Sequence, residues 1–404
     1  MKIYGSIRNL RVGRNLLLIL VLLLFLEFLS KSVLYYIVGL EDANYAHHYR
    51  NDPKLNLITW TEDYTPHPYF GYESPTTRAS EKILSERGSD DFVIGVLGGS
   101  VAGSFAEYSI RHPSHFESLR TTIPTIGEKN LRIVNLANGG FKQPQQFFVA
   151  TYFMDQLDLV INIDGFNEAD PSHLLPVYPL EFPNLSAKFY GRAKQGGVYA
   201  VIGRTARWAY KNITHAPLKI PGLSRSSLYF MCWYNLHDLL YRVVRASESA
   251  YYANEFEVHQ SETLRKTSSR ELIQNRIEIW KNYTILEDDL IRKRTGKPVF
   301  FFLQPNQYLK DSKPFTEEEK QVAVDPSLVE RNNEMMILLK EGVQDLRRSR
   351  VPIFDLTAIF SDTIETVYKD NCCHVNDLGN QIMADAIVSN IVLHQTEQGG
   401  RPRI

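Results

Sequence analysis

Phe92-Val-Ile-Gly-Val-Leu-Gly-Gly-Ser100 is the stretch from which the architecture of this chain can be worked out. Its apolar residues 92–97 predict a buried strand, and the two glycines and the serine after them predict a tight turn. Residues 101–108 can then begin a helix, which leaves Ser100 near the helix N-terminus. Unpaired backbone N–H groups and the positive end of the helix dipole stabilise a developing negative charge at such a position. We therefore treat Ser100 as a candidate catalytic residue.

Further apolar runs follow this strand at intervals along the chain. They lie at residues 131–136, 157–163, 299–303 and 352–356. Helical patterns lie between them, notably at residues 143–154 and 318–349. The predicted strands at residues 157–163 and 299–303 are strongly apolar, which is typical of strands that are covered on both faces. This alternation predicts an α/β domain with three layers, α/β/α, and a mainly parallel sheet of the flavodoxin-like kind.

The bulk composition is that of an ordinary globular protein. The 404 residues suffice for one large domain or two smaller ones, and 44% of them are hydrophobic. The formal net charge of −1 argues against a nucleic-acid partner, which requires a concentrated basic surface.

Three cysteines cannot form a disulfide scaffold. Cys372 and Cys373 are adjacent and Cys232 is distant in sequence, so we expect free thiols. One bridge from Cys232 to either of the others stays open in an oxidising compartment. The spacing matches no zinc site. We predict no metal and no organic cofactor.

The N-terminal segment predicts a membrane anchor. Basic residues precede an uninterrupted apolar run, and residues 16–40 together are long enough to cross a bilayer. Glu27 and Lys31, four positions apart, can pair on a helix there. The basic flank predicts that residues 1–15 are cytoplasmic and the rest extracytoplasmic. A cleavable signal peptide is the alternative, but Ser30-Lys31-Ser32 is a poor cleavage site, so we favour an uncleaved signal anchor.

Two further segments flank the predicted α/β domain of residues 91–394. Residues 41–90 are interpreted as a connector and entry segment. Within it, residues 60–72 are dense in aromatics and prolines and suit extended or turn structure, and His67 is expected to be structural. Residues 395–404 predict a frayed tail.

The α/β domain itself carries a predicted helical insertion or lid. Residues 171–295 are too many for a single crossover between two parallel strands. Within them, residues 178–210 predict an irregular loop, and residues 228–254 and 269–294 predict helices.

Four polar motifs fall at strand ends or just after them. They are Gly98-Gly99-Ser100, Asn135-Leu-Ala-Asn-Gly-Gly140, Asp164-Gly-Phe-Asn-Glu168 and Asp370-Asn-Cys-Cys-His374. Open α/β sheets bind ligands beyond the carboxyl ends of their strands, so these motifs are expected to converge. His374 is then a candidate base for the Ser100 hydroxyl. The Ser100 N–H, the Gly140 N–H and the Asn167 amide are candidate oxyanion donors.

In their order and spacing these blocks resemble the SGNH (GDSL-like) hydrolase superfamily, and the chain resembles a divergent, membrane-anchored member of it. The resemblance covers residues 91–170 and 298–392 and leaves out the insertion. The resemblance implies that Ser100 is the nucleophile and that His374 is the base. It also implies that Gly140 and Asn167 are oxyanion donors, in addition to the N–H of Ser100.

The chain departs from the superfamily pattern at three places. The usual Gly-Asp-Ser is Gly98-Gly99-Ser100 here, and Glu168 stands where aspartate is common. The position three before His374 is Asn371, whereas Asp370 lies four before it. The histidine is therefore oriented by Asp370 through a local bulge or more weakly by Asn371, or it works in a dyad with the serine. We favour Asp370, because an anion stabilises an imidazolium better than a neutral amide does.

The resemblance implies an exported, membrane-anchored serine esterase or deacylase that acts through an acyl-serine intermediate. It implies acylated small molecules or acylated envelope or extracellular glycans as substrates. One alternative is an O-acyltransferase that uses the same residues on a glycan acceptor. The other is a non-catalytic, anchored glycan-binding or assembly module.

Other readings of the same motifs fit less well. Residues 98–103 lack the Lys-Ser/Thr ending of a phosphate-binding loop. Asp164 and Glu168 can form the carboxylate pair of a glycoside hydrolase, but such residues more often cap turns and helices.

Overall fold

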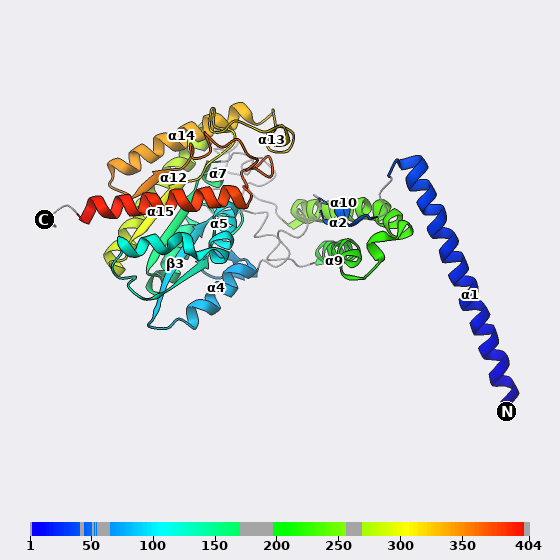
Figure 1. Cartoon of the computed structure of the whole chain (residues 1–404). Coiled ribbons are helices and arrows are strands. Elements are labelled where there is room, and N and C mark those ends of the chain that lie inside the picture. Colours follow the sequence, from blue (N-terminus) through cyan, green and yellow to red (C-terminus); the bar gives the residue numbers. More distant parts are fainter. Residues whose placement is uncertain are drawn as a thin grey trace. The chain divides into compact units, whose positions relative to one another are not determined.

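The computed structural model describes residues 2–40, 44–50, 52, 54, 65–169, 197–255 and 269–399. The chain divides into two compact units, and Figure 1 traces their elements. The helical unit comprises Met1–Glu62 and Gln195–Glu257, and the sheet unit comprises Asp63–Lys194 and Val258–Ile404. Each unit is described by itself.

The sheet unit is built on a five-stranded parallel sheet. Its strands are β3 (Asp91–Gly98), β4 (Asn130–Asn135), β5 (Leu159–Asp164), β6 (Val299–Leu303) and β7 (Ile353–Asp355). They lie in the order β4-β3-β5-β6-β7, and all neighbours are parallel. The five predicted strands and their parallel pairing are thus confirmed. Counted along the chain the order is 2-1-3-4-5, which places the ligand-binding switch point between β3 and β5.

Helices pack on this sheet and connect its strands. They are α4 (Pro75–Ser85), α5 (Ser100–Arg111), η2 (Pro113–Thr121), α6 (Gln145–Phe153), η3 (Met154–Gln156), α7 (Phe166–Ala169), α12 (Ser269–Thr295), α13 (Glu317–Val322), α14 (Val329–Arg348) and α15 (Asp377–Gly399). All residues of β3, β5 and β6 are buried, which explains their apolar sequences. The main core of this unit includes Phe105, Trp280 and Ile387.

Two helix predictions in this unit need correction. The predicted helix 318–349 is two helices, α13 and α14, separated by residues 323–328. Pro326 explains the break, because proline lacks an N–H and disfavours helical geometry in the residue before it. The predicted tail from residue 395 is helical as far as Gly399, since α15 continues to that residue. Residues 400–404 lie outside the described part of the chain.

The entry segment contributes a short antiparallel hairpin to the sheet unit. Its strands are β1 (Thr65–His67) and β2 (Gly71–Glu73). The predicted extended or turn structure is confirmed for residues 65–72, and residues 55–64 lie outside the described part. Helix α12 falls within the predicted insertion but belongs to the sheet unit, where Ile277 and Trp280 join the main core.

The helical unit contains the apolar N-terminal helix and a long helical pair. Its elements are α1 (Lys2–Val33), η1 (Leu34–Val38, π-helical), α2 (Ala46–Arg50), α9 (Gly197–Lys219), η6 (Leu223–Arg225) and α10 (Ser227–Glu255). Helices α9 and α10 pack along each other through Ala206, Tyr210 and Val244. The prediction of an irregular loop is wrong from Gly197 onward, because these side chains give α9 a face that packs on α10. Residues 178–196 lie outside the described part.

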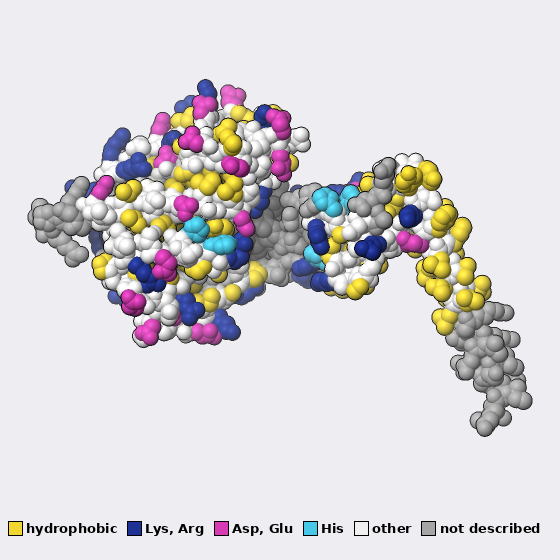
Figure 2. Space-filling model, in the orientation of Figure 1, with side chains coloured by type: hydrophobic (Ala, Val, Ile, Leu, Met, Phe, Trp, Pro, Cys, Tyr) yellow, Lys and Arg dark blue, Asp and Glu magenta, His cyan; other side chains and the backbone are white. Residues whose placement is uncertain are grey.

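One stretch of the helical unit, Asn15–Val38, is long and apolar enough to cross a membrane, with a mean hydropathy of 2.4. Figure 2 shows hydrophobic side chains along this helix. Glu27 within it accepts hydrogen bonds from Ser226 and from the first two residues of α10. The predicted pairing of Glu27 with Lys31 is therefore replaced by a contact between α1 and α10.

Candidate active site

The turn between β3 and α5 presents Ser100. Ser100 is the first residue of α5 and follows Gly98 and Gly99. A Cβ atom at Gly98 would lie 2.3 Å from the Ile163 carbonyl oxygen, and Gly98 has a positive φ of 138°. A Cβ atom at Gly99 would lie 2.2 Å from Nδ2 of Asn167. Only glycine fits at both positions, so this sequence allows the end of β5 to approach the serine turn.

Ser100, His374 and Asp370 form a continuous hydrogen-bonded chain. Ser100 Oγ lies 2.8 Å from His374 Nε2, and His374 Nδ1 lies 2.6 Å from Asp370 Oδ2. The His374 side chain keeps only 18% of its surface exposed. This is the geometry of a hydroxyl nucleophile, a general base and a carboxylate that orients the base.

A hairpin-like loop explains why an aspartate four positions before the histidine can reach it. Tyr368 and Val375 form an isolated antiparallel bridge that closes the loop. Inside it, Oδ1 of Asp370 accepts hydrogen bonds from the backbone N–H groups of Cys372, Cys373 and His374. The second carboxylate oxygen therefore remains available for the imidazole.

The structure brings Asp370, and not Asn371, to the histidine ring. Asn371 is exposed, and its carbonyl oxygen accepts a hydrogen bond of 2.6 Å from the Tyr308 hydroxyl. Burial by itself raises the pKa of Asp370. The hydrogen bond and charge of His374 and the backbone N–H groups outweigh that effect, so the pKa of Asp370 lies below its ordinary value. Asp370 is thus an anion at neutral pH.

Asn167 and Gly140 flank the serine turn. Asn167 lies on α7, directly after β5, and its Nδ2 donates to the Phe141 carbonyl at 3.0 Å. This bond uses one of the two amide hydrogens and leaves the other for a ligand. The Phe141 carbonyl lies 3.3 Å from the position of a Gly99 Cβ, so the loop at Gly140 borders the same turn. Within the described residues, the Gly140 N–H has no hydrogen-bond partner.

The entry segment holds the Gly140 loop, a role that the sequence analysis did not predict. The Tyr72 hydroxyl donates to the Gly139 carbonyl at 2.8 Å. The Asn138 side-chain oxygen accepts from the Ser74 N–H and the Thr77 hydroxyl, at 2.8 and 3.0 Å. Ser74 followed by a proline is a helix-start signal, but nothing in sequence connects it with Asn138.

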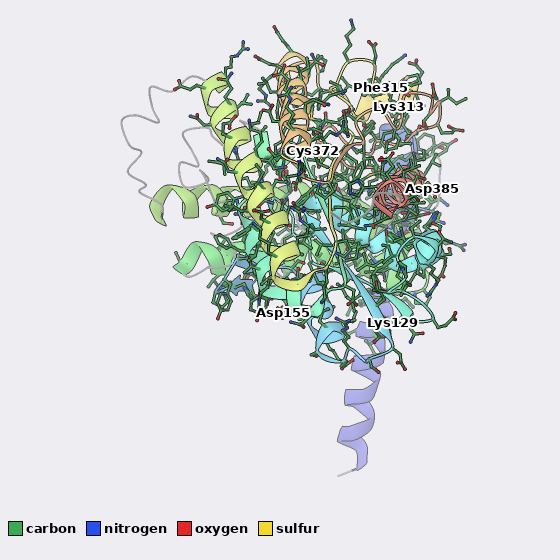
Figure 3. All side chains as sticks on the ribbon, turned by 90° about the vertical axis from the view of Figure 1, so that its left-hand side faces the viewer. Lys129, Asp155, Lys313, Phe315, Cys372 and Asp385 are labelled. Atoms are coloured by element: carbon green, nitrogen blue, oxygen red, sulfur yellow. The ribbon has the colours of Figure 1, made fainter. Side chains whose placement is uncertain are left out.

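A buried ion pair supports the loop that carries Asp370. The sequence analysis did not predict it. Lys313 Nζ lies 2.8 Å from Glu319 Oε2, and neither side chain is exposed. Lys313 is labelled in Figure 3. Oε1 of Glu319 accepts from the N–H groups of Val367 and Tyr368, at 2.9 and 3.0 Å. Thr316 and Glu319 form a capping box, which was the one signal readable from the sequence.

Asp164 and Glu168 are buried and hold the turn after β5. Glu168 accepts from the Gly165 N–H at 2.6 Å and from Gln146 at 3.1 Å. Asp164 accepts from the Trp280 indole at 2.8 Å. Burial raises the pKa of both carboxyls, and the charge of Glu168 further raises that of Asp164. The expected turn-capping role fits these contacts.

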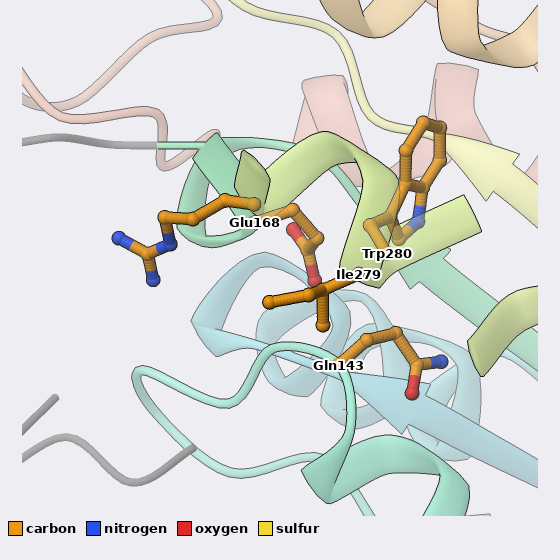
Figure 4. Close-up of a pocket in the computed structure, with 5 residues that line it drawn as sticks. Gln143, Glu168, Ile279 and Trp280 are labelled. Carbon is orange, nitrogen blue, oxygen red and sulfur yellow. The ribbon is translucent and has the colours of Figure 1, made fainter. Parts of the chain in front are cut away.

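A narrow surface recess lies next to this turn. Its walls are formed by Gln143, Glu168, Arg276, Ile279 and Trp280, drawn in Figure 4. Arg276 also donates to the Asn167 carbonyl at 3.3 Å. The recess therefore borders the turn that carries Asn167.

His67, Glu73 and Glu81 gather their ligand-type atoms within 4.8 Å of one another. His67 Nδ1 accepts from the Tyr69 N–H at 3.3 Å, which leaves the proton of the neutral ring on Nε2, facing Glu81. The His67 ring also stacks on Phe70, with centroids 3.6 Å apart. These contacts fit the expected structural role of His67.

The three cysteines are free thiols. Cys372 and Cys373 lie in the loop between Asp370 and His374 with their sulfur atoms 3.4 Å apart, and Cys373 is buried.

Comparison with known proteins adds no relative. The chain matches no protein-family model and no curated protein. The resemblance to the SGNH superfamily therefore rests on the order and spacing of the sequence motifs.

Proposed function

We propose that this chain is a serine esterase or deacylase of the SGNH type. The observation that carries the proposal is the hydrogen-bonded chain from Ser100 through His374 to Asp370, with Asn167 against the serine turn. A serine hydroxyl needs a base within hydrogen-bond reach and donors already placed for the oxyanion, and these residues supply both.

The first half of the reaction acylates the enzyme. Ser100 Oγ attacks the ester carbonyl carbon while His374 Nε2 takes the hydroxyl proton, and the carbonyl electron pair moves to oxygen. The Ser100 N–H, the Gly140 N–H and the Asn167 amide hold that oxyanion. Asp370 stabilises the imidazolium. Collapse of the intermediate breaks the bond to the alcohol, which leaves with the proton from His374.

The second half of the reaction returns the free enzyme. Water gives its proton to His374 Nε2 and attacks the acyl-serine carbonyl, and the same donors hold the second oxyanion. Collapse releases the carboxylic acid, and Ser100 Oγ recovers its proton from the histidine.

We further propose the setting in which this chemistry occurs. The strand order and the helices packed on the sheet support a three-layer α/β/α domain of the superfamily type. The apolar stretch Asn15–Val38 supports an anchor with residues 1–15 in the cytoplasm and the catalytic domain outside it. Acylated small molecules or acylated envelope or extracellular glycans are then the substrate class.

Hydrolysis of small acyl esters by the detergent-solubilised full chain tests the proposal. We expect Ser100→Ala to lower kcat/KM by about 10³-fold or more, because no other group takes the acyl chain. The matched control is Ser104→Ala on the same helix, which should retain the wild-type rate. If the wild type and Ser100→Ala are equally inactive on a broad panel of esters, the esterase proposal fails and a binding or assembly module is favoured. Acylation of an added glycan, in place of release of free acid, would assign the same residues to acyl transfer.

A further inference from the structure

The turn between α9 and α10 meets the apolar helix α1 near the middle of its membrane-length stretch. Glu27 of α1 accepts hydrogen bonds from the Ser226 hydroxyl at 2.7 Å and the Leu228 N–H at 3.1 Å, and also from the Ser227 N–H. Glu27 thus caps the N-terminus of α10, whose positive dipole end stabilises the carboxylate. This pairing explains how an acidic residue is tolerated between apolar runs.

Helix α1 has a bare part and a covered part. From Leu16 to Phe25 its side chains are exposed on every side, whereas Ser30 and Leu34 are buried on the face that also carries Glu27. Leu34 packs with Phe230 and Trp233 of α10. The bare part measures about 15 Å at about 1.5 Å per residue. That is about half of the roughly 30 Å hydrocarbon layer of a bilayer.

Two placements of α1 in a bilayer follow from these lengths. If the hydrocarbon begins at Leu16, it ends near Tyr35 and Tyr36, which are half exposed or more, as residues of an interfacial aromatic belt are. The α9–α10 turn then lies within the outer leaflet, at the depth of Glu27. If the bilayer thins around the short bare part of the helix, residues 1–15 still lie in the cytoplasm and the turn lies nearer the outer boundary. Both placements bring the turn into contact with lipid.

The composition of the turn suits that position. Residues 219–225 read Lys-Ile-Pro-Gly-Leu-Ser-Arg, with three apolar side chains between two cations. Ile220 is 54% exposed, and Lys219 and Arg225 are exposed on either side of it. Apolar tips enter the acyl region while flanking cations bind lipid phosphates, an arrangement common to interfacial segments.

We propose that the α9–α10 turn is a second membrane contact, in which the exposed Ile220 enters the outer leaflet beside α1. The inference rests on the proposed anchoring of the chain by α1. Its consequence is that the helical unit is fixed to the membrane surface at two points rather than suspended from one helix.

Photocrosslinking to lipid tests this contact in the full chain. Benzoylphenylalanine replaces Ile220, Leu22 or Leu239 in separate variants, reconstituted into vesicles of phosphatidylethanolamine and phosphatidylglycerol. Leu22 lies in the bare part of α1, and Leu239 is 56% exposed on α10, about 18 Å along that helix from Ser227. All three positions are exposed, so the probe displaces no core side chain. Mass spectrometry then measures the fraction of protein that carries phospholipid.

We expect phospholipid adducts at positions 22 and 220, with a several-fold excess of position 220 over position 239. Adducts at 22 but none at 220 would overturn the second contact and leave the anchor intact. Absence of adducts at both would overturn the anchor and the contact together. Crosslinking of position 220 to another copy of the chain, without lipid, would assign the turn to a protein interface instead.

Discussion

At the scale of single residues, the site depends on which atoms each side chain keeps free. Asp370 uses one carboxylate oxygen to close its own loop and the other to hold His374. Asn167 uses one amide hydrogen on the Phe141 carbonyl and keeps the second for a ligand. In the proposed reaction each of these residues has a structural and a chemical role, so substitution of either residue should change the kinetics of ester hydrolysis.

Asp370→Asn is expected to lower kcat by about 10³–10⁴-fold, because a neutral amide neither stabilises the imidazolium nor fixes the reactive tautomer. KM should change little, since the side chain does not touch substrate. Asn371→Ala is the matched control and should retain the wild-type kcat, as the Asn371 side chain is exposed. Steady-state hydrolysis of one ester by both variants decides between them. A larger loss in Asn371→Ala would contradict the assignment of Asp370.

Gly99→Ala is expected to lower kcat by about 10²–10³-fold, the usual effect of losing one oxyanion donor. The added methyl would stand 2.2 Å from Asn167 Nδ2 and must displace it. Gly103→Ala on the following helix α5 is the control, because the nearest atoms outside that helix lie 4.0 Å from its Cβ. Full activity of Gly99→Ala would show that Asn167 does not hold the oxyanion.

At the scale of elements, parallel strands deliver the site. Ser100 follows β3 and Asn167 follows β5, and these strands are neighbours in the sheet, so their carboxyl ends meet. His374 arrives differently, on a loop before α15 that no strand holds. Its support is Glu319, which binds the backbone of Val367 and Tyr368 from another part of the chain.

Glu319→Gln is expected to destabilise the protein by about 3–5 kcal/mol, the range for breaking one partner of a buried ion pair. Lys313 would keep its charge without a counter-ion in a site where neither side chain is exposed. Denaturant unfolding measures the difference, with Glu317→Gln on the exposed side of α13 as control. The double variant Lys313→Met with Glu319→Gln should recover part of the loss. A single variant as stable as the wild type would refute this support role.

Glu287 on α12 makes stability depend on pH. Burial raises its pKa to about 8, despite hydrogen bonds from Gln143 and Asn162 that lower it. The folded protein therefore holds a proton that the unfolded chain, with a pKa near 4.5, has lost at neutral pH. Between these two values stability falls as pH rises, by about 1.4 kcal/mol per pH unit for this one group, and it levels off above the higher value.

Between pH 5 and 8, Glu287→Gln should make the free energy of unfolding depend less steeply on pH, by about 1.4 kcal/mol per pH unit. Urea unfolding at several pH values measures it, and Glu341→Gln, an exposed carboxylate on α14, serves as control. The slope should not vanish, because burial also raises the pKa of Asp164 and Glu168. An unchanged slope in Glu287→Gln would mean that the buried carboxyl is ionised in the folded state.

At the scale of the whole molecule, the sequence predicts what depends on local pattern and neighbouring strands. The apolar runs of β3, β5 and β6 predict these strands because burial on both faces requires such residues. The meeting of Ser100 with Asn167 follows from strand order alone. The loop that lets Asp370 reach His374 does not, because its shape depends on Glu319, which lies far away in the chain. Pro326 indicates the break between α13 and α14, but the prediction of one helix over residues 318–349 considered only the helical periodicity.

The two units also divide the tasks of the chain. The sheet unit contains every residue of the candidate site, and the helical unit contains the apolar stretch. In the proposed setting, chemistry and attachment to the membrane are therefore carried by separate structures and can be tested separately.

Labelling of the active serine by a fluorophosphonate, followed by peptide mass spectrometry, tests the catalytic assignment at its centre. A phosphonyl group forms a bond to a serine oxygen, with loss of fluoride, only where a base activates that oxygen and donors hold the phosphoryl oxygen. We predict one adduct per chain, on Ser100, in the wild type and none in His374→Ala or in heat-unfolded protein. An unlabelled Ser100 in the folded wild type, or an adduct on another serine alone, would contradict the assignment.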